Sequence, residues 1–201
     1  MRFAEFRKIA DVRMRETLDR VGFRRTAAGR WNRRRDDELN VVHLQAHSVK
    51  DEFCVNLGVH YVFMPRLGVS DDDRIDIPDC LVKLRLTSHD SLNDQWWPIA
   101  MSSIGEVVGA LAGRGLSVFD LYRLDGPISD IDGKSVECGD ADLLASLTDV
   151  RACLFVALMH ERLGNRDKSI EAAEIGLKLA GMAIGLKKPL RDILRRLTHQ
   201  S

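Results

Sequence analysis

Two neighbouring segments with alternating side chains constrain the fold of this chain more than any other feature. Residues 52–63, EFCVNLGVHYVF, alternate between large apolar residues and small or polar ones, and residues 39–48, LNVVHLQAHS, alternate less regularly. Successive side chains of a β-strand point to opposite faces, so this period of two predicts two strands with one apolar face. The link between them is short enough for a hairpin, which predicts antiparallel neighbours.

The segments around this hairpin indicate an α+β fold. Residues 3–21 have the apolar period of an amphipathic helix, and residues 29–36 and 80–88 predict further strands. We therefore expect an N-terminal helix packed on an antiparallel sheet of about four strands. A short helix over residues 102–115, ended by its glycines, is expected to follow the sheet.

The last third of the chain has a helical period. Residues 140–163 and 167–181 predict two helices joined by the turn GNRD, and a last helix follows Gly185. We expect an α+β domain over residues 1–133 and a helical segment over residues 134–201 that packs on it. The helical hairpin is similar to a single tetratricopeptide unit, which places small residues where two helices meet, but a solenoid needs about three units and a plain helical hairpin is the simpler interpretation. Such residues occur here at Ala157, Gly164, Ser169 and Ala173.

Composition predicts a globular protein of the cytoplasm. Hydrophobic residues make up 45% of the chain and charged residues 30%, and the formal net charge is +0. The four cysteines are far apart, which favours buried thiols in a reducing compartment over a zinc cluster. The N-terminus lacks an apolar signal core, and the apolar runs are too short to span a membrane. We expect no membrane association.

Several motifs fall in an order that resembles a known family. They are GFR at residues 22–24, NVVHLQ at 40–45, VNLG at 55–58 and WW at 96–97. Together they resemble the uncharacterised, mainly bacterial family called domain of unknown function four-three-zero-four, over roughly residues 3–120. The resemblance implies a helix and an antiparallel sheet. It supplies no established activity and no catalytic residues.

Strand alternation gathers polar residues on one predicted sheet face. If the apolar residues of each strand face the core, the polar ones share the opposite side, with Gly58 leaving room for a ligand to approach the backbone. The candidate set is His43, Gln45, Asn56, His60 and Arg85. Such a mixed, cationic surface suits a carboxylate, a phosphate or an acidic partner. The simpler interpretation is the solvated side of an ordinary antiparallel sheet. Trp96 is a candidate partner-binding anchor, or a cap on the core.

Other chemistries find less support in the sequence. His43 and His47 would lie roughly 13 Å apart on a strand, too far for one metal ion, and we expect no metal and no cofactor. Cys54 and His60 share a predicted face, but a buried thiol is the simpler interpretation of Cys54. The basic run at residues 24–35 has few aromatic neighbours and precedes three acidic residues, so nucleic-acid binding is not expected.

Two classes of function remain after these exclusions. The first is a non-enzymatic binding or interaction protein for an acidic protein or a small anionic ligand. One version is an immunity-type protein that sequesters a toxin, which rests on analogy alone. The second is a small hydrolase or transferase that acts on an anionic substrate at the same face. The sequence leaves enzymatic activity and oligomeric state open.

Overall fold

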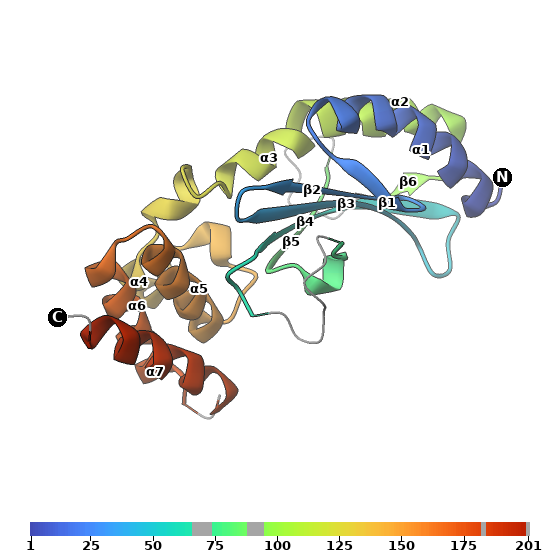
Figure 1. Ribbon diagram of the computed structural model, residues 1–201. Coiled ribbons are helices and arrows are strands. Elements are labelled where there is room, and N and C mark those ends of the chain that lie inside the picture. Colours follow the sequence, from blue (N-terminus) through green and yellow to red (C-terminus); the bar gives the residue numbers. More distant parts are fainter. Residues whose placement is uncertain (66–73, 88–94, 182–183, 200–201) are drawn as a thin grey trace. The chain divides into compact units, whose positions relative to one another are not determined.

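A computed structural model of the chain describes residues 1–65, 74–87, 95–181 and 184–199 (Figure 1). The chain divides into two compact units, residues 1–120 and residues 121–201. The N-terminal unit contains the sheet, and the C-terminal unit is helical. The predicted α+β class is therefore confirmed. None of the described helices combines the length and apolarity needed to cross a bilayer.

The N-terminal unit begins with a helix and is built on an antiparallel sheet of six strands. Helix α1 (Phe3–Arg20) ends before Gly22, whose φ of +87° is left-handed, and the chain then enters the sheet. The strand order is β1-β2-β3-β4-β5, and β6 pairs with β4. The strands are β1 (Arg24–Ala27), β2 (Arg30–Arg35), β3 (Glu38–Ala46), β4 (Glu52–Tyr61), β5 (Val82–Arg85) and β6 (Trp97–Pro98).

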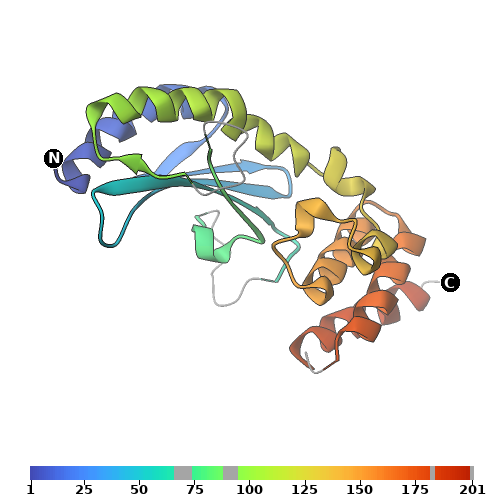
Figure 2. The same cartoon turned by 180° about the vertical axis from the view of Figure 1, so that it is seen from behind.

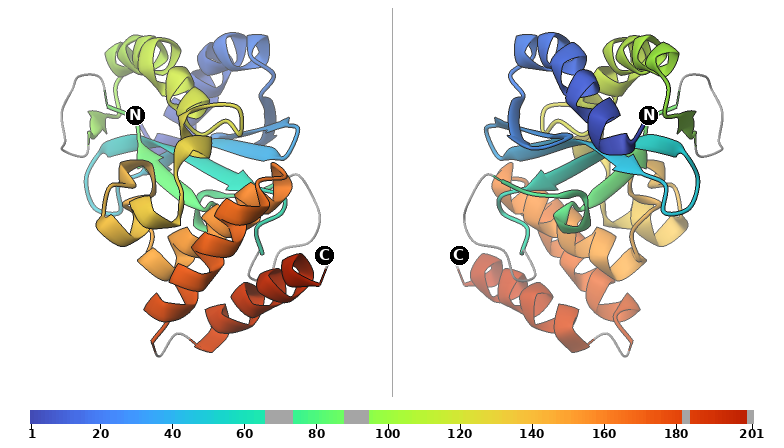
Figure 3. Two further views of the ribbon diagram at one scale, coloured as in Figure 1. Left: turned by 90° about the vertical axis from the view of Figure 1, so that its left-hand side faces the viewer. Right: turned by 90° about the vertical axis from the view of Figure 1, so that its right-hand side faces the viewer.

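Helices cover one face of this sheet, here called the helix-covered face. Helices α1 and α2 (Met101–Ala110) lie side by side along it in both end views (Figure 3). The Phe6 ring of α1 packs on Phe53 of β4, with centroids 4.6 Å apart, and Phe53 packs in turn on Trp97. Leu57 of β4 is also buried there, 1% exposed. The apolar side of the alternating segment therefore forms the core, as its period predicted.

The helix predicted over residues 102–115 is longer than the sequence suggested. It continues from α2 through a π-turn (Leu111–Gly115) into α3 (Leu116–Leu121), as the view from behind shows (Figure 2). Gly115 does not end the helix. A Cβ atom there would lie 2.9 Å from a methyl carbon of Leu86, so the glycine lets the helix approach the residue that follows β5.

A short segment crosses the opposite face of the sheet, here called the polar face. This crossing segment, residues 75–80, contains the 3₁₀ turn η1 (Ile77–Asp79), which lies on the side of the sheet away from α1 and α2 (Figure 1). Its apolar residues Ile75, Ile77 and Cys80 pack on Leu39 and Val41 of β3. Part of the polar face is thus covered by the chain itself.

The C-terminal unit is a set of short and medium helices. A helical hairpin of α5 (Asp149–Arg162) and α6 (Arg166–Leu179) forms its centre. Against it pack α4 (Gly133–Cys138) and α7 (Ile184–Thr198), with 3₁₀ turns at Pro127–Asp130 and Asp142–Leu144. The hairpin itself was predicted, although residues 140–148 lie largely outside its helices. The similarity to a tetratricopeptide unit is not confirmed.

Close helix contact in this hairpin depends on small residues. The Ser169 hydroxyl donates a hydrogen bond to the Ala157 carbonyl, 2.7 Å away, and a Cβ atom on Gly176 would lie 2.9 Å from the Cys153 Cβ. Cys153 is fully buried, and this burial raises the pKa of its thiol to about 11. The expectation that all four cysteines are buried is wrong for Cys138, which is exposed at the end of α4.

Candidate functional site

Four polar side chains form a transverse row across the polar face. Strand register pairs Arg30 of β2 with His43 of β3, His43 with Asn56 of β4, and Asn56 with Arg85 of β5. Directly paired residues of neighbouring strands project to the same face, so the four side chains lie together opposite Leu57. The prediction that His43, Asn56 and Arg85 share a face is confirmed.

One end of the row combines a guanidinium group with an indole ring. The Cζ atom of Arg85 lies 4.7 Å from the centroid of the Trp96 ring, within the range of a cation–π contact. The ring of His47 meets Trp96 edge-on, also at 4.7 Å, and its Nδ1 accepts hydrogen bonds from the backbone N–H groups of Val49 and Lys50. Arg85 and Trp96 are both half-buried. The Trp96 ring is thus held between His47 and Arg85, and the Arg85 charge lies over it.

An amide pair lies beside this end of the row. Asn56 Nδ2 donates to Gln45 Oε1 over 2.7 Å, and the Cys54 thiol lies 3.8 Å from Asn56 Oδ1. Gln45 is exposed, whereas Asn56 is only 6% exposed. Of the two side chains, only Gln45 is therefore able to form hydrogen bonds with a group outside the protein.

A carboxylate from the crossing segment occupies the other end of the row. Asp76 accepts from Arg30 Nη1 at 2.5 Å through one oxygen, and its other oxygen lies 3.2 Å from His43 Nδ1. Burial lowers the pKa of His43; the charge of Asp76 opposes this shift, while the charges of Arg30 and Arg7 of α1 add to it. The neutral form of His43 is therefore favoured near pH 7, with Nδ1 close to the carboxylate.

His60 lies on the polar face but is buried. It pairs with Leu39 in the β3–β4 register and is 1% exposed. Direct contact between His60 and a ligand is incompatible with this burial. Cys54 and His60 are six residues apart along β4, roughly 20 Å in a strand, so they do not form a nucleophile–base pair.

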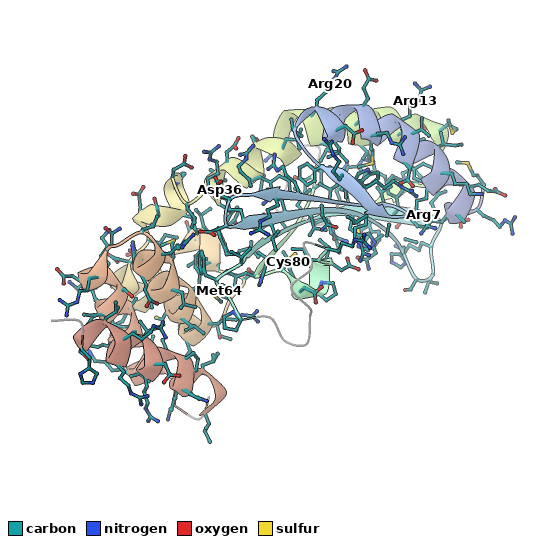
Figure 4. All side chains as sticks on the ribbon, in the orientation of Figure 1. Arg7, Arg13, Arg20, Asp36, Met64 and Cys80 are labelled. Atoms are coloured by element: carbon teal, nitrogen blue, oxygen red, sulfur yellow. The ribbon has the colours of Figure 1, made fainter. Side chains whose placement is uncertain are left out.

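The expectation that Gly58 leaves room for a ligand is wrong. A Cβ atom at Gly58 would lie close to Cys80 Sγ and 3.1 Å from a methyl carbon of Ile77. The crossing segment, with Cys80 (labelled in Figure 4), fills the space over Gly58. It therefore separates His60 from Asn56 on the polar face. Gly58 serves close packing within the chain.

Sequence reasoning missed Arg30 and Asp76. The signal for Arg30 was present, because Asp36-Asp37 joins β2 to β3 as a two-residue turn in which Asp36 has a φ of +51°. Such a turn pairs Arg35 with Glu38 and hence Arg30 with His43. Asp76 comes from an irregular connection, and strand periodicity gives no information about its position.

Other parts of the described chain offer less as sites. No group of three or more His, Cys, Asp or Glu side chains suited to a metal ion occurs among the described residues. The helical unit holds a cavity of about 90 Å³ with Asp142 and Asp149 in its wall. This volume is below the range of roughly 300–1,000 Å³ that is typical of ligand pockets.

Comparison with known proteins identifies the N-terminal segment. Residues 14–112 match the family described as Domain of unknown function (DUF4304). The match extends from the middle of α1 to the π-turn and includes the whole sheet and the transverse row. Neither the curated proteins nor the solved structures gave a match. The N-terminal unit of this chain is therefore similar to the DUF4304 family over about four fifths of its length.

Proposed function

We propose that the N-terminal unit is a binding domain that contacts an acidic protein partner through Arg85, Trp96 and Gln45, with buried Asn56 holding Gln45 in place by its hydrogen bond. The observation that carries this proposal is the half-buried Arg85 guanidinium set over the Trp96 ring. Arginine and tryptophan are enriched among the residues that dominate binding energy at protein interfaces. A guanidinium group binds carboxylates through two parallel hydrogen bonds, which favours Asp or Glu on the partner.

The layout of the row favours an extended partner over a small ligand. Arg30 and Arg85 are three strand spacings apart, about 14 Å between Cα atoms, with His43 and Asn56 between them. A protein surface spans this distance, whereas a small anion contacts one end only. The immunity-type role, in which the partner is a toxin, is one form of this proposal and rests on analogy.

An enzyme that acts on an anionic substrate is the second candidate. The observation in its favour is the pair formed by His43 and Asp76, with Nδ1 and Oδ1 3.2 Å apart. A neutral histidine oriented by a carboxylate is suited to accept a proton. In that case His43→Gln would abolish turnover of an anionic ester and leave binding of the substrate in place.

The test is recovery of a partner from the native cells by the tagged full-length protein. We expect one protein to be recovered by the wild type and lost with Arg85→Glu, because the reversal places like charges in contact. Arg13→Glu, on the exposed side of α1, is the matched control and should recover the same protein. Equal recovery by both variants would contradict the proposal. Recovery of a small anion in place of a protein would assign the face to a ligand.

A further inference from the structure

One side of helix α7 carries a row of cations. The side chains that α7 buries are Leu190, Ile193 and Leu197. Lys188, Arg191 and Arg195 are spaced by three and four residues on the opposite side of the helix, and all three are exposed. This set, here called the basic stripe, extends about 10 Å along the helix axis. It therefore points away from the other helices of the unit.

The basic stripe receives little compensation within the chain. Like charges three or four residues apart on a helix repel each other. Among the described residues, Lys188 and Arg191 have no carboxylate within ion-pair distance, and Arg195 has Asp192 at 3.5 Å in a largely exposed pair. Such exposed pairs contribute little. The stripe therefore offers positive charge to a group outside the molecule.

An acidic surface surrounds the cavity of the same unit. Asp142 and Asp149 stand in the wall of this cavity, where α4 ends and α5 begins. Burial and the charges of Asp149 and Glu137 together raise the pKa of the Cys153 thiol, which places both carboxylates near it. All three acidic side chains are exposed, and in the described part of the unit none has a cationic partner. The cavity with these three carboxylates is here called the acidic hollow.

The size and lining of the acidic hollow suit the end of one basic side chain. Its volume of about 90 Å³ is about three times the share of one water molecule in the liquid. Apart from the two carboxylates, the lining residues are glycine, alanine, valine and leucine. A lysine or arginine side chain has an apolar stem and a cationic head, so it complements both parts of this lining.

The two surfaces do not meet within one molecule. Helix α4 packs on the α5–α6 hairpin from one side and α7 from the other (Figure 3). The basic stripe faces outward from α7, and no ion pair between described residues joins it to the acidic hollow. A second copy of the chain brings a stripe and a hollow together.

We propose that the helical unit binds a second copy of this chain head to tail, with the basic stripe of one molecule on the acidic hollow of the next. The end of one basic side chain enters the hollow between Asp142 and Asp149. Because the two surfaces differ, a pair keeps one free stripe and one free hollow, so association continues into chains. The contact depends on complementary charge, so salt weakens it. It does not involve Arg85 and is independent of the proposed function.

Sedimentation velocity of the full-length protein tests this contact. At low ionic strength, we expect the weight-average sedimentation coefficient to increase with protein concentration beyond that of a dimer. In about 1 M NaCl, where the Debye length is about 3 Å, the coefficient should stay at the monomer value. A monomer at every concentration in low salt would overturn the proposal.

Two neutralised variants assign the contact to these surfaces. The stripe variant carries Lys188→Gln, Arg191→Gln and Arg195→Gln, and the hollow variant carries Glu137→Gln, Asp142→Asn and Asp149→Asn. Each variant alone should remain monomeric in low salt. An equimolar mixture should form dimers and stop there, because each pair holds one intact stripe and one intact hollow. Dimers in the mixture also show that both variants are folded.

A control variant separates the basic stripe from net charge. It removes three exposed cations of α1 through Lys8→Gln, Arg13→Gln and Arg15→Gln. This variant should associate as the wild type does. The proposal is overturned if the control becomes monomeric, if the stripe or hollow variant alone still forms chains, or if the mixture of the two stays monomeric.

Discussion

Both faces of the sheet hold an arginine against aromatic rings, but the two arginines are in opposite environments. On the helix-covered face, Arg33 is 6% exposed and its Cζ lies 4.6 Å from the Phe23 ring centroid and 5.3 Å from that of Phe119. On the polar face, Arg85 is half-buried over Trp96. The same type of contact therefore occurs both in the core and at the surface.

The difference shows what each arginine can do. Arg33 gives Nε and Nη2 to Asn40 Oδ1, at 3.0 and 2.8 Å, and Nη1 to the Val21 carbonyl at 3.2 Å. A buried charge must be satisfied within the chain, so Arg33 serves the fold. Arg85 lies where a partner can reach the surface. A cation–π contact alone thus does not mark a binding residue, whereas its exposure and neighbours do.

The largest expected effect is on the helix-covered face. Leu57→Ala should cost about 2–5 kcal/mol of unfolding free energy, because Leu57 is 1% exposed and packs in the core. Lys83→Ala, an exposed position on the polar face, is the control and should change stability by less than about 0.5 kcal/mol. Chemical denaturation measures both. A loss under about 0.5 kcal/mol for Leu57→Ala would contradict the assignment of the core.

Arg33→Met should have the next largest effect. The variant keeps most of the apolar stem but leaves Asn40 Oδ1 and the Val21 carbonyl without their donor, at a cost of about 1.5–3 kcal/mol. Arg34→Met, at the exposed neighbouring position, should stay within about 0.5 kcal/mol of the wild type. A neutral or stabilising Arg33→Met would show that the guanidinium is dispensable for the fold.

Gly58→Ala tests the crossing segment on the polar face. The added methyl group would overlap Cys80 Sγ, so we expect a loss of about 1–3 kcal/mol in chemical denaturation. The double variant Gly58→Ala with Cys80→Ala should recover part of this loss, beyond the sum of the two single effects. If Gly58→Ala is neutral, the crossing segment does not pack on Gly58.

The smallest expected effect concerns pH. The folded-state pKa of His43 is lowered from 6.5, chiefly by burial, so its neutral form is favoured in the folded protein. The stability that this provides is fully present above pH 6.5 and is lost as the pH falls from 6.5 through the lower pKa of the folded state. The stability difference between wild type and His43→Gln should therefore become less favourable to the wild type between pH 7.5 and pH 5.5. A constant difference over this range would contradict the pKa direction.

The alternation of apolar and polar residues along β3 and β4 allowed much of the sheet to be predicted, because the apolar residues of each strand face the core. It placed His43, Asn56 and Arg85 on one face correctly. It did not reveal that Cys80 covers Gly58 or that Asp76 reaches His43, because both belong to an irregular segment positioned by tertiary contacts. The glycines after α2 were misjudged as a helix end, since glycine also permits close packing inside a helix.

The most direct test of the central claim, that the polar face binds through Arg85 and the helix-covered face maintains the fold, is the Kd of Arg85→Ala for the partner recovered from native cells. Calorimetry on the full-length protein should give a Kd about 10- to 150-fold higher than that of the wild type, the scale of a lost charge-assisted hydrogen bond. The unfolding free energy should change by less than about 0.5 kcal/mol. An unchanged Kd, or weaker binding that is matched by a loss of stability, would contradict the account.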